Sequence, residues 1–142
     1  MSWRIAKSLE ELRTQVNKRA PDRSNASDGS IGDAKHASRR SDHNPHVKDG
    51  KTGVVTAIDI THDPAGGCDS YALAKSLIDS RDVRIKYIIS NGQIASGPDG
   101  PSPWTWRKYT GTNPHSHHVH ISVRAKKDLY DGTAPWKFDL GK

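Results

Sequence analysis

The chain has 142 residues, the length of one ordinary domain, and 32% of them are apolar, enough to build a core. No apolar run approaches the roughly 20 residues that cross a bilayer, so we expect no transmembrane segment. A single cysteine, Cys68, excludes an internal disulfide and a cysteine-based zinc knuckle. The net charge of +6 should attract polyanions, of which nucleic acid and an anionic bacterial cell wall are two.

Residues 8–19 carry the pattern of an amphipathic helix. Ser8 can cap its first turn, and Glu11, three residues later, can act as the capping-box partner. The apolar side chains of this helix form one stripe, Leu9, Leu12 and Val16. Residues 22–33 are rich in Ser, Asn, Asp and Gly, a composition that predicts a loop.

A strand is predicted over residues 54–60, after an exposed turn over residues 44–53. Alternation places Val55, Ala57 and Asp59 on one face of this strand, so that a carboxylate ends an otherwise apolar segment. Burying a lone ionised carboxylate costs several kcal/mol unless the group is paired or coordinated. We therefore expect a cation beside Asp59.

The middle of the chain predicts a second helix and a hairpin. The helix covers residues 71–80, with Asp69 or Ser70 as its cap. Its buried face consists of Leu73, Leu77 and Ile78. Two strands follow, at residues 85–90 and 93–96, joined by the hairpin turn Asn91-Gly92. Helices packed on one side of a small antiparallel sheet make an α+β domain.

Residues 97–113 are rich in Gly, Pro and aromatic side chains and lead to the histidine-rich part of the chain. Trp104, Trp106 and Tyr109 can line a groove for a ligand or pack beneath the loop, which is the commoner fate of such aromatics. The tail around Trp136 is expected to pack against the fold.

Four of the eight histidines fall within six residues, at positions 115, 117, 118 and 120. The run continues into Ile121-Ser122-Val123, the apolar alternation of a strand. Side chains two apart on a strand share a face, so His118 and His120 should point into the same space while Val119 turns into the packing. Two imidazoles do not complete a zinc site, which usually takes three protein ligands.

The remaining ligands can come from His43 and Asp59. With His120 they supply two neutral nitrogens and one anionic oxygen, a set that suits zinc and leaves one position open for water. Zinc lowers the pKa of its bound water to roughly 7 and polarises a carbonyl oxygen. The combination predicts a hydrolytic centre.

These residues resemble the zinc peptidase superfamily that includes D-alanyl-D-alanine carboxypeptidases, lysostaphin-type endopeptidases and the hedgehog amino-terminal domain. The chain looks closest to small phage endolysin peptidases. The family pattern is Ser-x-His, then a strand carrying Asp, then a late His-x-His or Glu-x-x-His on another strand. Ser41-Asp42-His43, Asp59 and His118-Val119-His120 match it in order, within a core of about residues 29–123. The interval from His43 to Asp59 is longer than in the compact motif, and the loop between them can absorb the difference.

The resemblance implies one domain over residues 1–142 with a hedgehog/DD-peptidase-like α+β fold, zinc held by His43, Asp59 and His120, and His118 as the general base. No Glu stands three residues before His120, so His115 and His117 stay open as alternative bases. Arg40 or His115 would stabilise the oxyanion or a substrate carboxylate.

The implied substrate is the stem peptide of peptidoglycan, with Ser41 and Trp106 touching it. Whether the enzyme is a carboxypeptidase or an endopeptidase stays open. We expect a monomer that binds no nucleic acid. The first twelve residues lack the hydrophobic stretch of a secretory signal, so we expect synthesis in the cytoplasm and action on the wall after a holin-type protein or lysis releases the enzyme.

Two other functions fit parts of the sequence. His36-Ala37-Ser38 and His120-Ile121-Ser122 both have the His-x-Ser spacing of metal-independent two-histidine phosphodiesterases. A non-catalytic module that binds the cell wall and keeps zinc for structure is the second.

His62 and Asp63 are alternative candidates for the zinc ligands. Asp63 also suits a turn in which its side chain accepts hydrogen bonds from local backbone amides.

Overall fold

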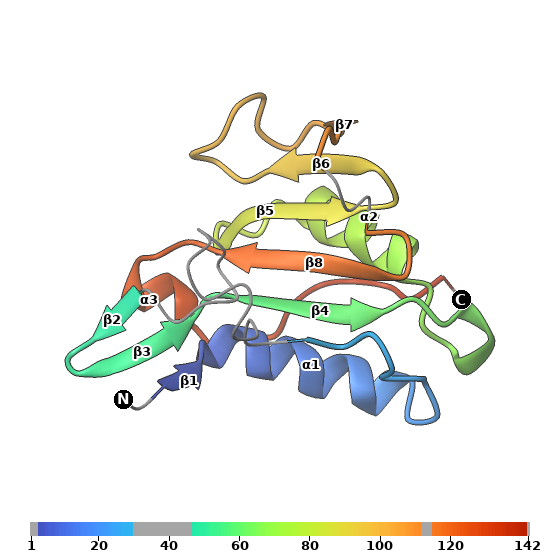
Figure 1. Ribbon diagram of the computed structural model, residues 1–142, viewed down its shortest axis with the longest axis horizontal. Coiled ribbons are helices and arrows are strands. Elements are labelled where there is room, and N and C mark those ends of the chain that lie inside the picture. The colour runs from blue at the N-terminus through green and yellow to red at the C-terminus, as the bar shows by residue number, and fades with distance from the viewer. Residues whose placement is uncertain (1–2, 30–46, 112–114, 142) are drawn as a thin grey trace.

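The computed structural model describes residues 3–29, 47–111 and 115–141. Within these residues the chain forms two sheets, of three and five strands, and three α-helices (Figure 1). The predicted α+β class is confirmed. No helix in the described residues is long and apolar enough to span a membrane.

The larger sheet is antiparallel and has the strand order β4-β8-β5-β6-β7. Its strands are β4 (Ala57–Thr61), β8 (His118–Val123), β5 (Ile85–Ser90), β6 (Gln93–Ser96) and β7 (Arg107–Lys108). The hairpin between β5 and β6 is the predicted one, and both turn residues, Asn91 and Gly92, have positive φ. β8 comes last in the chain of these five and lies between β4 and β5.

The smaller sheet has the order β1-β3-β2. Its strands are β1 (Trp3–Ile5), β3 (Thr52–Val55) and β2 (Val47–Asp49). The prediction of one strand over residues 54–60 is therefore wrong. The carbonyl of Val55 accepts from Ala6 at 2.9 Å, whereas that of Thr56 accepts from Val123 at 2.8 Å, so neighbouring residues belong to different sheets. As a result Asp59 lies within β4 and does not end it.

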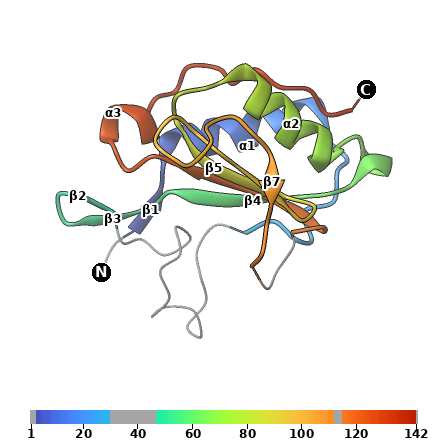
Figure 2. The same cartoon turned by 90° about the horizontal axis from the view of Figure 1, so that it is seen from above.

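Two long helices cover one side of the larger sheet, α1 (Lys7–Arg19) and α2 (Ser70–Ser80) (Figure 2). The predicted stripes of both helices are buried, together with Ile58 and Ile60 of β4 and Val119 and Ile121 of β8. A short 3-10 turn, η2 (Pro64–Gly66), precedes α2, and a short helix, α3 (Lys127–Tyr130), follows β8. The alternation of the strands thus gives one face to the core and leaves the other for polar side chains.

The start of α1 differs from the prediction. The helix begins at Lys7 and its capping position is Ala6, so the expected cap by Ser8 and Glu11 is wrong. Ser8 is fully buried, and its hydroxyl has no hydrogen-bond partner among the described residues. Instead, the Lys7 N–H donates to the carboxylate of Asp131 at 3.1 Å. Asp131, which is distant in sequence, therefore accepts from an N–H group in the first turn of α1, the role that the sequence pattern predicted for Ser8.

The start of α2 and the tail follow the prediction. Asp69 caps α2 by accepting from the N–H groups of Tyr71 and Ala72 at 3.0 and 3.2 Å. In the tail, the Trp136 ring is buried and its Nε1–H donates to the carbonyl of Ser8 at 2.8 Å. The guanidinium carbon of Arg84 lies 3.8 Å from the centre of the same ring. The tail is thereby tied to the side of the domain that carries α1.

Candidate functional site

The register between β4 and β8 places Asp59 directly opposite His120. Asp59 Oδ1 lies 3.3 Å from His120 Nδ1, and Asp59 Oδ2 lies 3.5 Å from His118 Nε2. The two imidazoles therefore share a face, as the alternation predicts, and Val119 is buried in the core on the other side. Each oxygen of one carboxylate faces a nitrogen of a different histidine.

The carboxylate and both rings are largely withdrawn from water. The side chain of His120 is 6% exposed, that of Asp59 16% and that of His118 17%. His120 Nε2 lies 2.8 Å from the hydroxyl of Ser122, which is fully buried, and the Tyr87 ring stacks on the imidazole. His120 is thus held on both sides, with Nδ1 directed at the carboxylate and Nε2 at a hydroxyl.

The distances from Asp59 to the two histidines are longer than good charge-assisted hydrogen bonds, which are about 2.7–2.9 Å. Two ligands that bind one tetrahedral zinc at about 2.0–2.2 Å lie about 3.3–3.5 Å from each other. The 3.3 Å between Asp59 Oδ1 and His120 Nδ1 and the 3.5 Å between Asp59 Oδ2 and His118 Nε2 both fall in this range. The donor set, one carboxylate oxygen and one imidazole nitrogen, also suits zinc.

Gly29 lies against the outer side of Asp59. The backbone N–H of Asp59 donates to the carbonyl of Gly29 at 2.8 Å, and the N–H of Gly29 donates back at 3.3 Å. A Cβ atom at position 29 would lie 3.0 Å from Asp59 Oδ2. Because glycine has no Cβ, it avoids this close contact with the Asp59 carboxylate.

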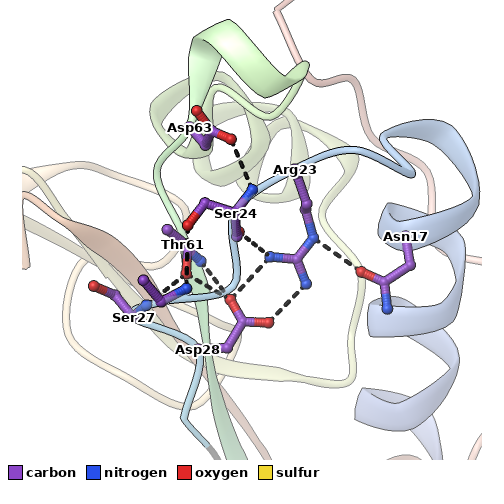
Figure 3. A network of polar contacts seen from close by, with 8 residues as sticks. Asn17, Arg23, Ser24, Ser27, Asp28, Thr61 and Asp63 are labelled. Carbon is purple, nitrogen blue, oxygen red and sulfur yellow. Dashed lines mark hydrogen bonds and ion pairs between the residues drawn. The ribbon is translucent and has the colours of Figure 1, made fainter.

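A buried ion pair holds the segment before Gly29 against the end of β4 (Figure 3). Arg23 donates to both carboxylate oxygens of Asp28, at 2.9 and 2.7 Å. The backbone N–H and the hydroxyl of Thr61 donate to the same carboxylate at 2.8 and 2.7 Å. Burial alone would raise the pKa of Asp28, but the hydrogen bonds from Arg23 and Thr61 outweigh it and hold that pKa below its usual value.

His115 is a third imidazole beside the pair. Its ring centre lies 5.1 Å from that of His118 and 5.5 Å from that of His120, and the Tyr109 ring meets it edge-on. Its backbone has a φ of 57°, in the left-handed region. His117, by contrast, is exposed. Of the candidate bases in the histidine run, His118 faces Asp59, and His115 lies against the rings of His118 and His120.

Asp63 and His62, the alternative candidates for zinc ligands, make local structural contacts instead. Asp63 accepts from the N–H groups of Gly66 and Ser24, the turn role expected for it. The ring of His62 stacks on Tyr71, and its Nδ1 lies 3.1 Å from the N–H of Ser70.

The aromatic and cysteine candidates lie at the core. Trp104 and Trp106 are half-buried and pack against the apolar cluster, so contact of Trp106 with substrate stays a prediction. Cys68 is buried, and burial raises the pKa of its thiol to about 11. A thiol in these surroundings is a structural group.

Five predicted residues lie outside the described part of the chain, namely His36, Ser38, Arg40, Ser41 and His43. Within the described ranges no three His, Cys, Asp or Glu side chains form a group that could hold a metal ion by itself. The described chain therefore supplies two of the three expected ligands, Asp59 and His120, and the expected base, His118. Sequence reasoning missed Gly29 and Ser122 as neighbours of these ligands, although the spacing of Ser122 from His120 was visible.

Fold and site together define an α+β domain with a His-Asp-His cluster on the sheet face opposite α1 and α2. Comparison of the chain with protein-family models, with curated proteins and with solved structures found no match. The likeness to the zinc peptidases therefore depends on the motif residues alone.

Proposed function

We propose that this protein is a zinc-dependent peptidoglycan peptidase of the endolysin type, with a hedgehog/DD-peptidase-like fold. It hydrolyses an amide bond in the stem peptide or the cross-link of the bacterial cell wall. The observation that carries the proposal is the convergence of His120 Nδ1 and His118 Nε2 on the Asp59 carboxylate, at 3.3 and 3.5 Å, which are separations that ligands of one tetrahedral ion have. The motif resemblance assigns His120 as the ligand and His118 as the base.

In this proposal Asp59 and His120 hold zinc together with His43, which lies outside the described residues. Ser122 accepts the Nε2–H of His120, which selects the tautomer whose Nδ1 lone pair faces Asp59. Zinc, when bound, supplies a water of lowered pKa and polarises the scissile carbonyl. Gly29 leaves space at Asp59 Oδ2, so the carboxylate can keep its orientation.

His118 is the general base of the proposed reaction. Its Nε2, 3.5 Å from Asp59 Oδ2, lies beside the proposed ligands and can accept the proton of the attacking water. The same imidazolium then gives the proton to the leaving amine. His115, within 5.5 Å of both other rings, or Arg40 stabilises the oxyanion or a substrate carboxylate.

The proposed substrate is inferred from the net charge of the chain and from its resemblance to the zinc peptidases. A net charge of +6 favours an anionic wall over neutral polymers, and Ser41 and Trp106 are the proposed contacts to the stem peptide. The protein acts as a monomer, needs no nucleic acid, and reaches the wall after release from the cytoplasm by a holin-type protein or by lysis.

The test combines metal analysis with hydrolysis of purified peptidoglycan fragments, followed by mass spectrometry. Asp59→Asn keeps the shape of the side chain and should remove both zinc and activity. Asp79→Asn, an exposed position on α2, is the matched control and should behave as wild type. Hydrolysis that continues in a strong chelator would contradict the proposal, and the mass of the products separates carboxypeptidase from endopeptidase cleavage.

The general base has its own variant. His118→Ala should lower kcat by about 10²–10⁴-fold with zinc content unchanged. If the protein is instead a wall-binding module without catalysis, wild type and His118→Ala should both retain zinc and wall binding, and neither should hydrolyse peptidoglycan.

The second candidate, a metal-independent phosphodiesterase, is favoured by one contact. His120 Nε2 lies 2.8 Å from Ser122 Oγ, so this His-x-Ser pair shares a face, while His36 and Ser38 are outside the described residues. Cleavage of a cyclic nucleotide in the presence of chelator would support this function. Failure to cleave it, with chelator-sensitive hydrolysis of peptidoglycan, excludes it.

A further inference from the structure

The segment that leads into β8 is held at three consecutive backbone carbonyls, those of residues 115–117. Each accepts a hydrogen bond from a different part of the fold. The donors are the Asn91 N–H at 3.0 Å, the Tyr71 hydroxyl at 2.8 Å and the His62 N–H at 2.9 Å. The histidine run is therefore fixed before the strand begins.

Only one of these three donors is a side chain. Asn91 and His62 donate through the backbone, whereas Tyr71, in the first turn of α2, donates through its hydroxyl to Ser116. The imidazole of His62 stacks on the Tyr71 ring, with centres 3.9 Å apart and planes 10° from parallel. His62 is in turn held through its Nδ1 by the N–H of Ser70. The stacked His62 ring therefore fixes the orientation of the Tyr71 ring and, with it, the direction of its hydroxyl.

The segment needs such support because His115 has a left-handed backbone, with a φ of 57°. A residue other than glycine keeps this conformation only where its surroundings impose it. The conformation accompanies a position in which the His115 ring meets His118 at 5.1 Å. His118 and His120, by contrast, sit inside the ladder between β4 and β8, where backbone pairing places them opposite Thr61 and Asp59.

We propose that Tyr71 is a positioning residue for the histidine run. Its bond to the carbonyl of Ser116 sets where the His115 ring lies relative to the rings of His118 and His120, and it leaves the backbone positions of those two residues to the sheet. Tyr71 acts from α2 through Ser116 and is stacked on His62. The consequence for catalysis rests on the proposed function, whereas the positioning itself does not.

Tyr71→Phe tests this inference because it keeps the ring and its stacking on His62 and deletes only the hydroxyl. We expect kcat on peptidoglycan fragments to fall about ten-fold, with KM and zinc content near wild type. In the metal-free protein without substrate, the ring-proton resonances of His115 and His118 should shift. Tyr130→Phe is the matched control, because Tyr130 is a buried tyrosine of α3 whose ring faces the guanidinium of Arg4. It should leave kcat and both sets of resonances unchanged.

The outcomes separate this inference from the proposed function. If the wild-type protein neither binds zinc nor hydrolyses peptidoglycan, the proposed function fails and the resonances alone decide: shifted rings support the positioning role, and unshifted rings overturn it. If wild type is active, an unchanged kcat in Tyr71→Phe overturns the role. Loss of zinc together with activity overturns it too, because the pairing of Asp59 with His120 would then depend on Tyr71.

Discussion

His62 directly follows β4 and His120 lies in the middle of β8, and the side chains of both are largely withdrawn from solvent. Their surroundings differ. His62 Nδ1 accepts from the N–H of Ser70 at the start of α2, so its lone pair is already used. His120 Nδ1 faces the carboxylate of Asp59 at 3.3 Å.

Burial therefore does not distinguish a structural histidine from one that is proposed to bind zinc. What matters is the partner of each nitrogen. A lone pair that meets an N–H group is satisfied and cannot bind a cation, whereas a nitrogen that faces a carboxylate can share a cation with it when the ring proton is on the other nitrogen. Substitutions at the two histidines and their neighbours can test this distinction.

The largest effect is expected from deleting the two rings. His120→Ala should abolish zinc binding and lower hydrolysis by about 10²-fold or more, since a ligand is lost. His62→Ala should retain zinc and cost about 1 kcal/mol of folding free energy, because an acceptor at the start of α2 is lost. Metal analysis and urea unfolding measure the two effects. Equal zinc loss in both variants would remove the distinction.

The next effect concerns the hydroxyl that each ring contacts. Ser122 lies 2.8 Å from His120 Nε2, and Ser70 Oγ lies 3.0 Å from His62 Nδ1. Ser122→Ala should weaken zinc binding by about 10–100-fold, the usual cost of losing a partner that orients a ligand. Ser70→Ala should leave zinc affinity unchanged. Competition with a chromogenic chelator gives both affinities, and equal values in the two variants would count against zinc at His120.

A smaller effect, on folding stability, is expected at the Arg23–Asp28 ion pair, which lies against the end of β4. The pKa of Asp28 is lowered in the folded protein, so its charged form stabilises the fold above the ordinary carboxyl pKa, and this stability is lost as the pH falls through the lowered value. Asp28→Asn should cost about 1–2 kcal/mol near pH 7. The gap between wild type and variant should shrink as the pH falls below 3.8, the ordinary pKa of an aspartate side chain. Urea unfolding at several pH values measures it, and a gap independent of pH would show that the charge is not responsible.

The smallest effect reports on the side of the sheet where His62 lies. Cys68 is buried there, next to the cap of α2, and the pKa of its thiol is raised to about 11. Alkylation of the native protein at pH 8 should therefore be far slower than alkylation of the urea-unfolded chain. Mass spectrometry of the labelled protein follows both rates. Equal rates would show that the His62 side is open to solvent.

Local patterns predicted much of this arrangement. Period-two alternation gave the shared face of His118 and His120, and the Asp69 cap and the Asn91-Gly92 turn follow from residue type. These features depend on neighbours in sequence, which is why a single chain reveals them.

Contacts between distant segments could not be predicted in this way. The break at Thr56 depends on Val123, and the N–H of Lys7 is satisfied by Asp131. The hydroxyl of Tyr71 reaches Ser116, 45 positions later. Nothing near these residues in sequence indicates such partners. The roles of His43, Ser41 and Arg40 stay predictions, because those residues lie outside the described chain.

The position of β8 also constrains how the protein is synthesised. Of the five strands of its sheet, β8 leaves the ribosome last, yet it separates β4 from β5. Until it emerges, β4 lacks its strand partner in this sheet, β5 is paired only with β6, and Asp59 has no imidazole from residues 118–120 beside it. Closure of the sheet and assembly of the His-Asp-His cluster are therefore one event, and the nascent chain carries no complete cluster before that event.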